Sequence, residues 1–244
     1  MTTNILDRLH ISERDQSHPN MRPRDAATLI LIDRSGPAPK VLMGRRHARH
    51  KFMPGVFVFP GGRLETFDAR MPYAGDLSAT NSARLMKMVQ RPSMARARGL
   101  ALAALRETAE EVGLLLGQAA ERMPKLPSDS WQPFADAKVL PDLAQLHFIA
   151  RAITPPRRNR RFDARFFAAD ADAVRHRIDG VVGPDSELDE MVWIPLAEAQ
   201  TLELSTITQV ILEELEQRIA HGFGAALPVP FFRVMHGKFV REVL

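Results

Sequence analysis

The hydrophobic pattern at the beginning of the chain predicts a β-hairpin followed by a third strand. Residues 26–33 form an almost continuous apolar run, which is typical of a strand buried on both faces. A Ser-Gly-Pro turn at residues 35–37 separates this run from a second one that begins at residues 40–44. A shorter apolar run at residues 56–59 leads directly into Pro60 and two glycines. We therefore expect three strands, the last of which ends in a tight turn.

A helical period governs residues 97–116. Apolar positions recur on one face, which can be buried: Leu102, Leu105, Ala109 and Val112. Three carboxylates share another face at positions i, i+3 and i+4: Glu107, Glu110 and Glu111. Carboxylates this close repel one another unless a cation lies among them, and oxygen ligands suit Mg²⁺ or Mn²⁺ rather than zinc. The plainer alternative is a solvated acidic face.

The remaining pattern alternates between strands and helices. Strands are predicted at residues 143–153, 162–168 and 191–195. Helices are predicted at residues 76–90 and from Ser205, as N-cap, to about Ile219, while Ser93 is placed to cap the carboxylate-bearing helix. This order indicates an α/β fold with one domain over residues 24–244. Residues 1–23 are polar and without a clear period, and we expect an arm of the kind that packs on a partner subunit in a homodimer.

Composition excludes several classes of protein. An apolar content of 45% with 25% charged residues is ordinary for a soluble globular protein, and no apolar run approaches the roughly 20 residues of a membrane span. The absence of cysteine excludes disulfides, thiolate zinc sites and a cysteine nucleophile, and the cytoplasm is the expected location. The net charge of +4 suits a polyanionic small molecule. An RNA-binding module would need exposed aromatic residues for base stacking, and one Tyr and two Trp offer few, so we expect no nucleic-acid partner.

Two basic runs offer candidate phosphate ligands. They lie at residues 45–51 and 157–161, and we select Arg46, Arg157 and Arg160 because a guanidinium can donate two hydrogen bonds to one phosphate. Either run could instead be a solvated charged loop.

Two segments together resemble the Nudix box: Phe59-Pro60-Gly61-Gly62-Arg63-Leu64-Glu65, and Arg106-Glu107-Thr108-Ala109-Glu110-Glu111-Val112-Gly113-Leu114. Thr108 stands where the family has an aliphatic residue, and Asp68 stands where it has a glutamate. Arg106 follows Gly62 by 44 positions, about 30 more than in the box. Such a split box resembles that of the peroxisomal coenzyme A diphosphatases and their bacterial relatives, as do residues 52–55, 153–155 and 161–167.

This resemblance implies a Nudix-type α/β/α sandwich with a mixed sheet and a helical insertion at residues 66–96. It implies Mg²⁺ or Mn²⁺ held by Glu107, Glu110, Glu111 and the carbonyl of Gly61. Arg106 would orient these ligands through an ion pair with Asp68 or Glu65. The general base in such enzymes is often a loop glutamate before a strand tryptophan, so Glu187 is the first candidate, before Glu190 and Glu107. The insertion is expected at the rim of the pocket or at a dimer interface.

The implied reaction is hydrolysis of a pyrophosphate linkage in a nucleoside diphosphate derivative. Coenzyme A or acyl-coenzyme A is the first candidate substrate, and ADP-ribose or a dinucleotide is the second. Some Nudix domains are ligand sensors without catalysis, but those commonly lose box glutamates, and all three are present in this chain.

Overall fold

The computed structural model describes residues 5–12, 17–49, 54–224 and 227–244. The helices are α1 (Ile5–Ser12), α2 (Ala79–Met86), α3 (Met94–Val112), α4 (Gln132–Asp136), α5 (Leu196–Ala199) and α6 (Thr206–Ala220). The strands are β1 (Arg24–Asp33), β2 (Lys40–Arg46), β3 (Phe57–Val58), β4 (Gly61–Arg63), β5 (Leu114–Ala119), β6 (Val139–Pro141), β7 (His147–Ile153), β8 (Phe162–Asp170), β9 (Val174–Arg177), β10 (Leu188–Pro195), β11 (Pro230–Met235) and β12 (Lys238–Val243). Within these residues no helix is both long and apolar enough to cross a membrane.

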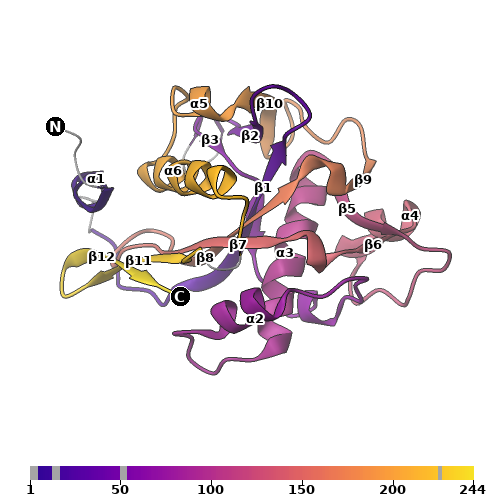
Figure 1. Cartoon of the computed structure of the whole chain (residues 1–244), viewed down its shortest axis with the longest axis horizontal. Coiled ribbons are helices and arrows are strands. Elements are labelled where there is room, and N and C mark those ends of the chain that lie inside the picture. Colours follow the sequence, from indigo (N-terminus) through magenta and orange to yellow (C-terminus); the bar gives the residue numbers. More distant parts are fainter. Residues whose placement is uncertain (1–4, 13–16, 50–53, 225–226) are drawn as a thin grey trace.

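A mixed sheet forms the centre of the molecule (Figure 1). Its strand order is β10-β2-β1-β8-β7-β11-β12, with β3 beside β2 and β4 beside β1. The β1–β8 and β7–β11 pairs are parallel and the other pairs are antiparallel. A smaller sheet, β6-β5-β9, extends the fold beyond the end of α3.

Helices cover both faces of the central sheet, and successive side chains of β1 alternate between the two helical layers. Ala27, Leu29 and Leu31 pack with α3 in one core, whereas Ile30 and Ile32 pack with α6 in the other (Figure 1). Because successive side chains of a strand point to opposite faces, a strand between two helical layers must be apolar at nearly every position. The arrangement confirms the predicted α/β fold with a mixed sheet between helices.

The carboxylate-bearing helix begins as predicted but ends earlier. The Ser93 hydroxyl accepts a hydrogen bond from the backbone N–H of Arg96 and caps α3. Gly113 ends the helix in the left-handed region at φ 70°, and a Cβ there would lie 2.3 Å from the carbonyl oxygen of Ile178. The predicted extension of this helix to residue 116 is therefore wrong, because Gly113 turns the chain into β5.

The N-terminal segment contains a helix that packs on its own domain. Leu9 of α1 is buried in the α6-side core, and Arg8 forms an ion pair of 2.7 Å with Glu213 on α6. The prediction of a separate arm over residues 1–23 missed this helix, because eight residues give little periodic signal. The C-terminal hairpin β11–β12 was likewise not predicted.

The insertion at residues 66–96 is partly helical and lies against α3. Its helix α2, capped by Ser78, is shorter than the predicted 76–90. Buried Leu77 and Leu85 join the α3-side core. None of its described residues lines the catalytic cavity described below. A position at the rim of the pocket or at a dimer interface stays a prediction.

Candidate active site

One face of the sheet forms the floor of a cleft. On β1 this face carries Arg24, Ala26 and Thr28, and strand register places two neighbouring strands beside them. Ala26 and Thr28 lie opposite Arg63 and Gly61 on β4, while Arg24, Ala26 and Thr28 lie opposite Phe162, Ala164 and Phe166 on β8. Residues separated by more than 100 positions in the sequence therefore share one surface.

The two glycines of the β4 turn let helix α3 approach this floor. A Cβ at Gly61 would lie 2.6 Å from the carbonyl oxygen of Ala27. A Cβ at Gly62 would lie 2.3 Å from the carboxylate of Glu107. Both distances are far below any real contact. A side chain at Gly61 would meet the backbone of β1 and push β4 away, whereas one at Gly62 would displace the carboxylate of Glu107. Close packing therefore explains both glycines of β4.

Arg106 is the centre of a buried hydrogen-bond network. Its Nε and Nη2 donate to Asp68 at 2.8 and 3.2 Å, and its Nη1 donates to Glu107 and Glu110 at 2.9 Å each. Asp68 is fully buried, which identifies it as the partner of Arg106, while Glu65 lies 3.9 Å from Arg63 instead. Burial alone would lower the pKa of Arg106, but the three carboxylates raise it above its ordinary value. The arginine therefore stays charged and fixes the carboxylates.

Thr108, the departure from the aliphatic residue of the box, is accommodated inside the helix. It is fully buried, and its hydroxyl donates to the carbonyl oxygen of Ala104 at 2.8 Å. Because the hydroxyl finds a partner one turn back, this polar substitution leaves no unsatisfied group.

The carboxylates of Glu107 and Glu111 have unusual electrostatics. Glu111 is 8% exposed and accepts a hydrogen bond of 3.0 Å from the backbone N–H of Gly61. Burial, together with the charges of Glu187 and Glu107, raises the pKa of Glu111 well above its ordinary value. Burial also raises the pKa of Glu107, although Arg106 opposes that shift. Negative charge is thus concentrated where little solvent reaches it, an environment that favours a bound cation.

Most predicted site residues line a single cavity of about 340 Å³. Its walls are formed by Ala26, Thr28, Arg46, Gly61, Gly62, Arg63, Glu107, Glu111, Arg160, Phe162, Ala164 and Glu187. Arg46 on β2 and Glu187, just before β10, form an ion pair of 2.8 Å across it. We call this space the catalytic cavity.

Other predicted residues lie elsewhere. Glu110 is turned toward Arg106 and does not line the catalytic cavity. Arg157 is exposed, in the left-handed region at φ 60°, and also lies outside it. Glu190 is tied to Arg45 at 3.1 Å. Residues 50–53, which belong to the first basic run and to the split-box resemblance, lie outside the described part of the chain.

The donor set fits a hard divalent cation in its chemistry. Glu107 and Glu111 offer only oxygen atoms, and burial of their charges raises the pKa of both. In the side-chain conformations of the described residues, no three acidic or histidine groups come close enough together to hold an ion. Glu110 would have to leave Arg106 to complete the predicted set with the Gly61 carbonyl.

An apolar cavity of about 280 Å³ adjoins the catalytic cavity, and the sequence did not reveal it. The two share Thr28, Arg46, Gly61, Glu111, Phe162 and Ala164. Its apolar wall comes from four separate elements through Leu9, Phe166, Ile207 and Phe232. The aromatic residues of β8 and β11 were the available signal, but they carry no information on what those strands enclose.

No family model matches this sequence, and no curated protein matches it. Among solved structures, a NUDIX hydrolase from Alicyclobacillus acidocaldarius is 29% identical, with a TM-score of 0.59, over 79% of this chain and 90% of its own. The NUDIX domain of Shewanella oneidensis NrtR is 14% identical over 82% of this chain and 90% of its own, with a TM-score of 0.45. A MutT NUDIX hydrolase from Burkholderia pseudomallei is 16% identical over 80% and 99%, also with a TM-score of 0.45. The last two are too distant to bear on the assignment.

The mixed sheet between helices, the box residues on the β4 turn and α3, and the similarity to the Alicyclobacillus structure agree. Together they define a Nudix-type fold and support a pyrophosphohydrolase.

Proposed function

We propose that this enzyme hydrolyses a pyrophosphate linkage in a nucleoside diphosphate derivative, with Mg²⁺ or Mn²⁺ as cofactor. One observation carries the proposal. Glu107, Glu111, Glu187 and Arg46 surround a single cavity whose floor is the Gly61–Gly62 turn. Carboxylates of raised pKa facing an arginine suit a substrate that brings both phosphate charge and divalent cations.

The cation supplies charge neutralisation at the phosphoryl oxygens and lowers the pKa of the attacking water. Glu107 and Glu111, with Glu110 and the Gly61 carbonyl, would hold it. Arg106 touches no substrate and acts as a positioning residue, because it holds Glu107 and Glu110.

Glu187 is the candidate base. Its carboxylate lies in the catalytic cavity and is held 2.8 Å from the guanidinium of Arg46. It would take the proton from the water as the new oxygen–phosphorus bond forms and the bond to the leaving phosphate breaks. Glu190 lies outside the catalytic cavity and is paired with Arg45, and Glu107 is held by Arg106 as an expected metal ligand. Once Glu187 has taken the proton and lost its charge, Arg46 would turn to a phosphoryl oxygen of the substrate.

Coenzyme A or an acyl-coenzyme A is the substrate that this surface favours. The apolar cavity opens from the catalytic cavity beside Gly61 and Glu111, so a substrate cleaved there could extend an apolar arm into it. ADP-ribose has no such arm. A panel of coenzyme A, acetyl-coenzyme A, ADP-ribose and a diadenosine polyphosphate, with Mg²⁺ or Mn²⁺ and product masses, tests the choice. No cleavage of either coenzyme A form would contradict it.

The catalytic proposal is tested by neutral substitutions of the same shape. Glu107→Gln and Glu110→Gln should each lower the metal-dependent rate by about 10³-fold, equivalent to roughly 4 kcal/mol of barrier. The exposed Glu121→Gln is the matched control and should keep full activity. An unchanged rate in both box variants would remove α3 from the mechanism.

The base is tested by a second matched pair. Glu187→Gln should lower kcat by about 10²-fold or more without abolishing metal binding, while Glu190→Gln should leave kcat almost unchanged. The reverse result would assign the base to Glu190.

A further inference from the structure

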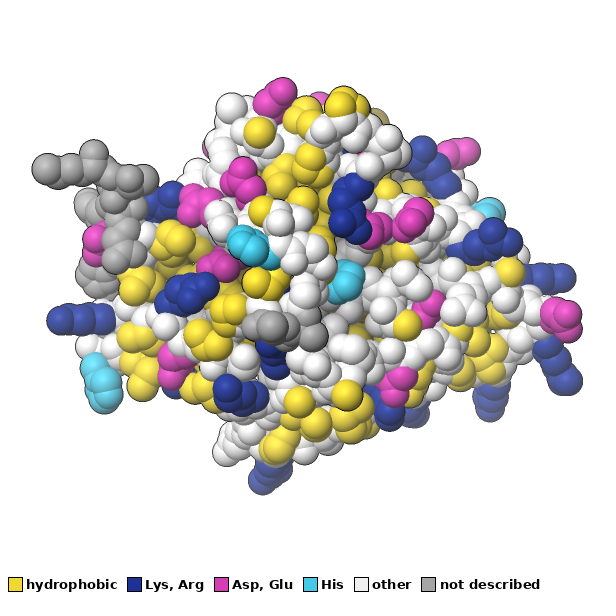
Figure 2. Space-filling model, viewed as in Figure 1, with side chains coloured by type: hydrophobic (Ala, Val, Ile, Leu, Met, Phe, Trp, Pro, Cys, Tyr) yellow, Lys and Arg dark blue, Asp and Glu magenta, His cyan; other side chains and the backbone are white. Residues whose placement is uncertain are grey.

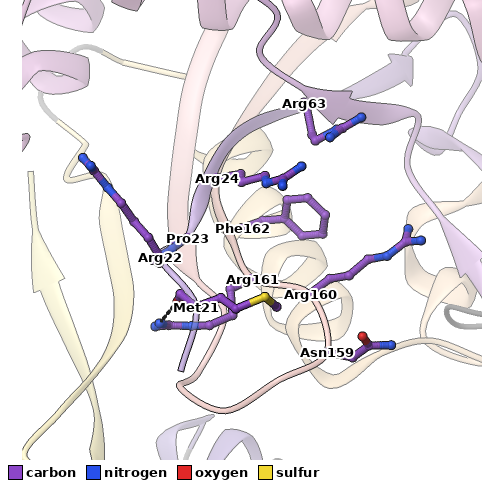
Figure 3. Close-up of a pocket in the computed structure, with 9 residues that line it drawn as sticks. All are labelled: Met21, Arg22, Pro23, Arg24, Arg63, Asn159, Arg160, Arg161 and Phe162. Carbon is purple, nitrogen blue, oxygen red and sulfur yellow. Dashed lines mark hydrogen bonds between the residues drawn. The ribbon is translucent and has the colours of Figure 1, made fainter. Parts of the chain in front are cut away.

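A second cavity, of about 700 Å³, adjoins the catalytic cavity and is strongly basic (Figure 3). Among the residues that the structure describes, no acidic side chain lines it, and five arginines do: Arg22, Arg24, Arg63, Arg160 and Arg161. It shares Arg63, Arg160 and Phe162 with the catalytic cavity. The two cavities are therefore neighbours that share part of their walls.

Three of the five arginines face a common space around Phe162. The β1–β8 register places Arg24 opposite Phe162, and the β1–β4 register places Arg63 two residues along, opposite Ala26. In Figure 3 the side chains of Arg24, Arg63 and Arg160 extend to the same side, around the ring of Phe162. For Arg24 and Arg63 this geometry follows from strand pairing, and so it is fixed by the sheet.

The other two arginines serve a different purpose. The guanidinium of Arg161 donates to the carbonyl oxygen of Thr154 at 3.1 Å and to the side chain of Asn20 at 2.7 Å, which ties the chain before β1 to the loop before β8. Arg22 points away from the others in Figure 3 and approaches Gln90 at 3.5 Å. We therefore place neither in the binding set.

Arg24 and Arg63 differ from most arginines of the molecule in their carboxylate contacts. Among the described residues, Arg24 makes no side-chain hydrogen bond or ion pair, and the carboxylate nearest to Arg63 is Glu65 at 3.9 Å. By contrast, Arg34, Arg96, Arg98, Arg151 and Arg233 each donate two hydrogen bonds to one carboxylate. In Figure 2, basic side chains are scattered over the visible face, several of them beside acidic ones. Repulsion among like charges in one cavity is relieved by an anion.

We propose that Arg24, Arg63 and Arg160 bind a phosphate group that the substrate carries in addition to its scissile pyrophosphate. This inference rests on the proposed function, and it defines the substrate class as nucleotide derivatives with at least three phosphates. The planar guanidinium suits the group because it donates two parallel hydrogen bonds to one phosphate. Phe162 offers an apolar surface beside it for the base or sugar that bears the phosphate. The phosphate is either a ribose monoester or the distal end of a longer phosphate chain.

Binding of ligands that need no catalysis tests the proposal. Isothermal titration in EDTA compares adenosine 3′,5′-bisphosphate with 5′-AMP, and tripolyphosphate with pyrophosphate. The wild-type enzyme should prefer the more phosphorylated member of one pair by about tenfold or more. The double variant Arg24→Gln/Arg63→Gln should lose that preference. Arg175→Gln/Arg177→Gln on β9 removes the same charge from exposed positions that line none of the three cavities and should keep it.

The pair that shows the preference identifies the source of the phosphate. Preference for the bisphosphate assigns a ribose monoester, and preference for tripolyphosphate assigns a phosphate chain. Equal affinity within both pairs for the wild-type enzyme overturns the proposal, and so does a preference that survives in the double variant. Because these probes are bound in the absence of metal, an enzyme that fails to hydrolyse coenzyme A contradicts the proposed substrate while leaving the binding result intact.

Discussion

Two groups of arginines lie on the two sides of the central sheet, and they differ in their contacts with carboxylates. Arg24 and Asp25 are neighbours on β1 and so point to opposite faces. On the α3 side, Asp25 accepts hydrogen bonds from Arg96 at 2.7 and 2.8 Å and from Arg165 at 2.8 Å. On the cleft side, Arg24 is exposed beside Arg63 and Arg160. We call these the paired group and the open group.

The paired group is completed by Arg151, which donates two hydrogen bonds to Asp163 at 2.8 and 2.7 Å. Arg165 is fully buried, a state that requires compensating charge. Burial would raise the pKa of Asp25, but Arg96 and Arg165 hold it below its ordinary value. The charges that serve the fold therefore have carboxylate partners, whereas the proposed role of the open group is to bind a ligand.

The largest expected effect is a difference in unfolding free energy between a variant of the paired group and a variant of the open group. Asp25→Ala should cost about 3–5 kcal/mol of unfolding free energy, because it strips partners from the buried guanidinium of Arg165. Arg24→Ala, the adjacent change, should stay within about 0.5 kcal/mol. Urea denaturation at pH 7 measures both. Since the folded pKa of Asp25 is lowered, its contribution is present above the unfolded pKa of about 3.9 and is lost as the pH falls through the folded pKa. Equal losses in the two variants would remove the contrast.

The next prediction compares the buried ion pair of Asp68 and Arg106 with an exposed ion pair. Asp68→Asn should cost about 3 kcal/mol, because Arg106 is buried and keeps only carboxylates that are needed elsewhere. It should also lower kcat, because Glu107 and Glu110 lose a fixed Arg106. Asp76→Asn, which breaks an exposed pair with Arg98, should cost less than about 1 kcal/mol and spare activity. Thermal unfolding and initial rates distinguish the two roles.

Removing the charge of Glu111 should stabilise the fold, unlike the two substitutions above. The reason is that burial of this carboxylate raises its pKa. A carboxylate whose folded pKa is raised destabilises the fold above that pKa and ceases to do so at lower pH. Glu111→Gln keeps an oxygen that can accept the Gly61 hydrogen bond and removes the charge. The metal-free variant should therefore melt about 3 °C or more above the wild type at pH 8, with a smaller gain at pH 5, and lose activity. A lower Tm at pH 8 would contradict the electrostatic account.

The smallest expected effect is a change in how KM depends on the salt concentration. Exposed charges are screened over about 8–10 Å at 0.1–0.15 M ionic strength, so KM of the wild type should rise several-fold between 50 and 300 mM salt. Arg24→Gln/Arg63→Gln should start from a higher KM and respond less. Parallel salt curves for the two enzymes would indicate that the open group does not contact the substrate.

The sequence by itself determined the features that depend on neighbouring residues. Apolar runs predicted β1 and β2, and the 3.6-residue period predicted α3 and α6 with their Ser93 and Ser205 caps. The box glutamates were found for the same reason, because one turn of a helix places Glu107 and Glu111 together. Gly113 was a readable stop signal for α3 that the helical period obscured.

The tertiary structure alone decided the open group and the choice of Asp68 as the partner of Arg106. Arg24, Arg63 and Phe162 meet because two strands pair with β1 in one register, and a shift by one residue would turn them to the other face. The apolar cavity likewise needs α1, α6 and β11 at once. Periodicity is a property of adjacent residues, whereas register and enclosure arise from contacts between distant segments, and so no local pattern along the chain encodes them.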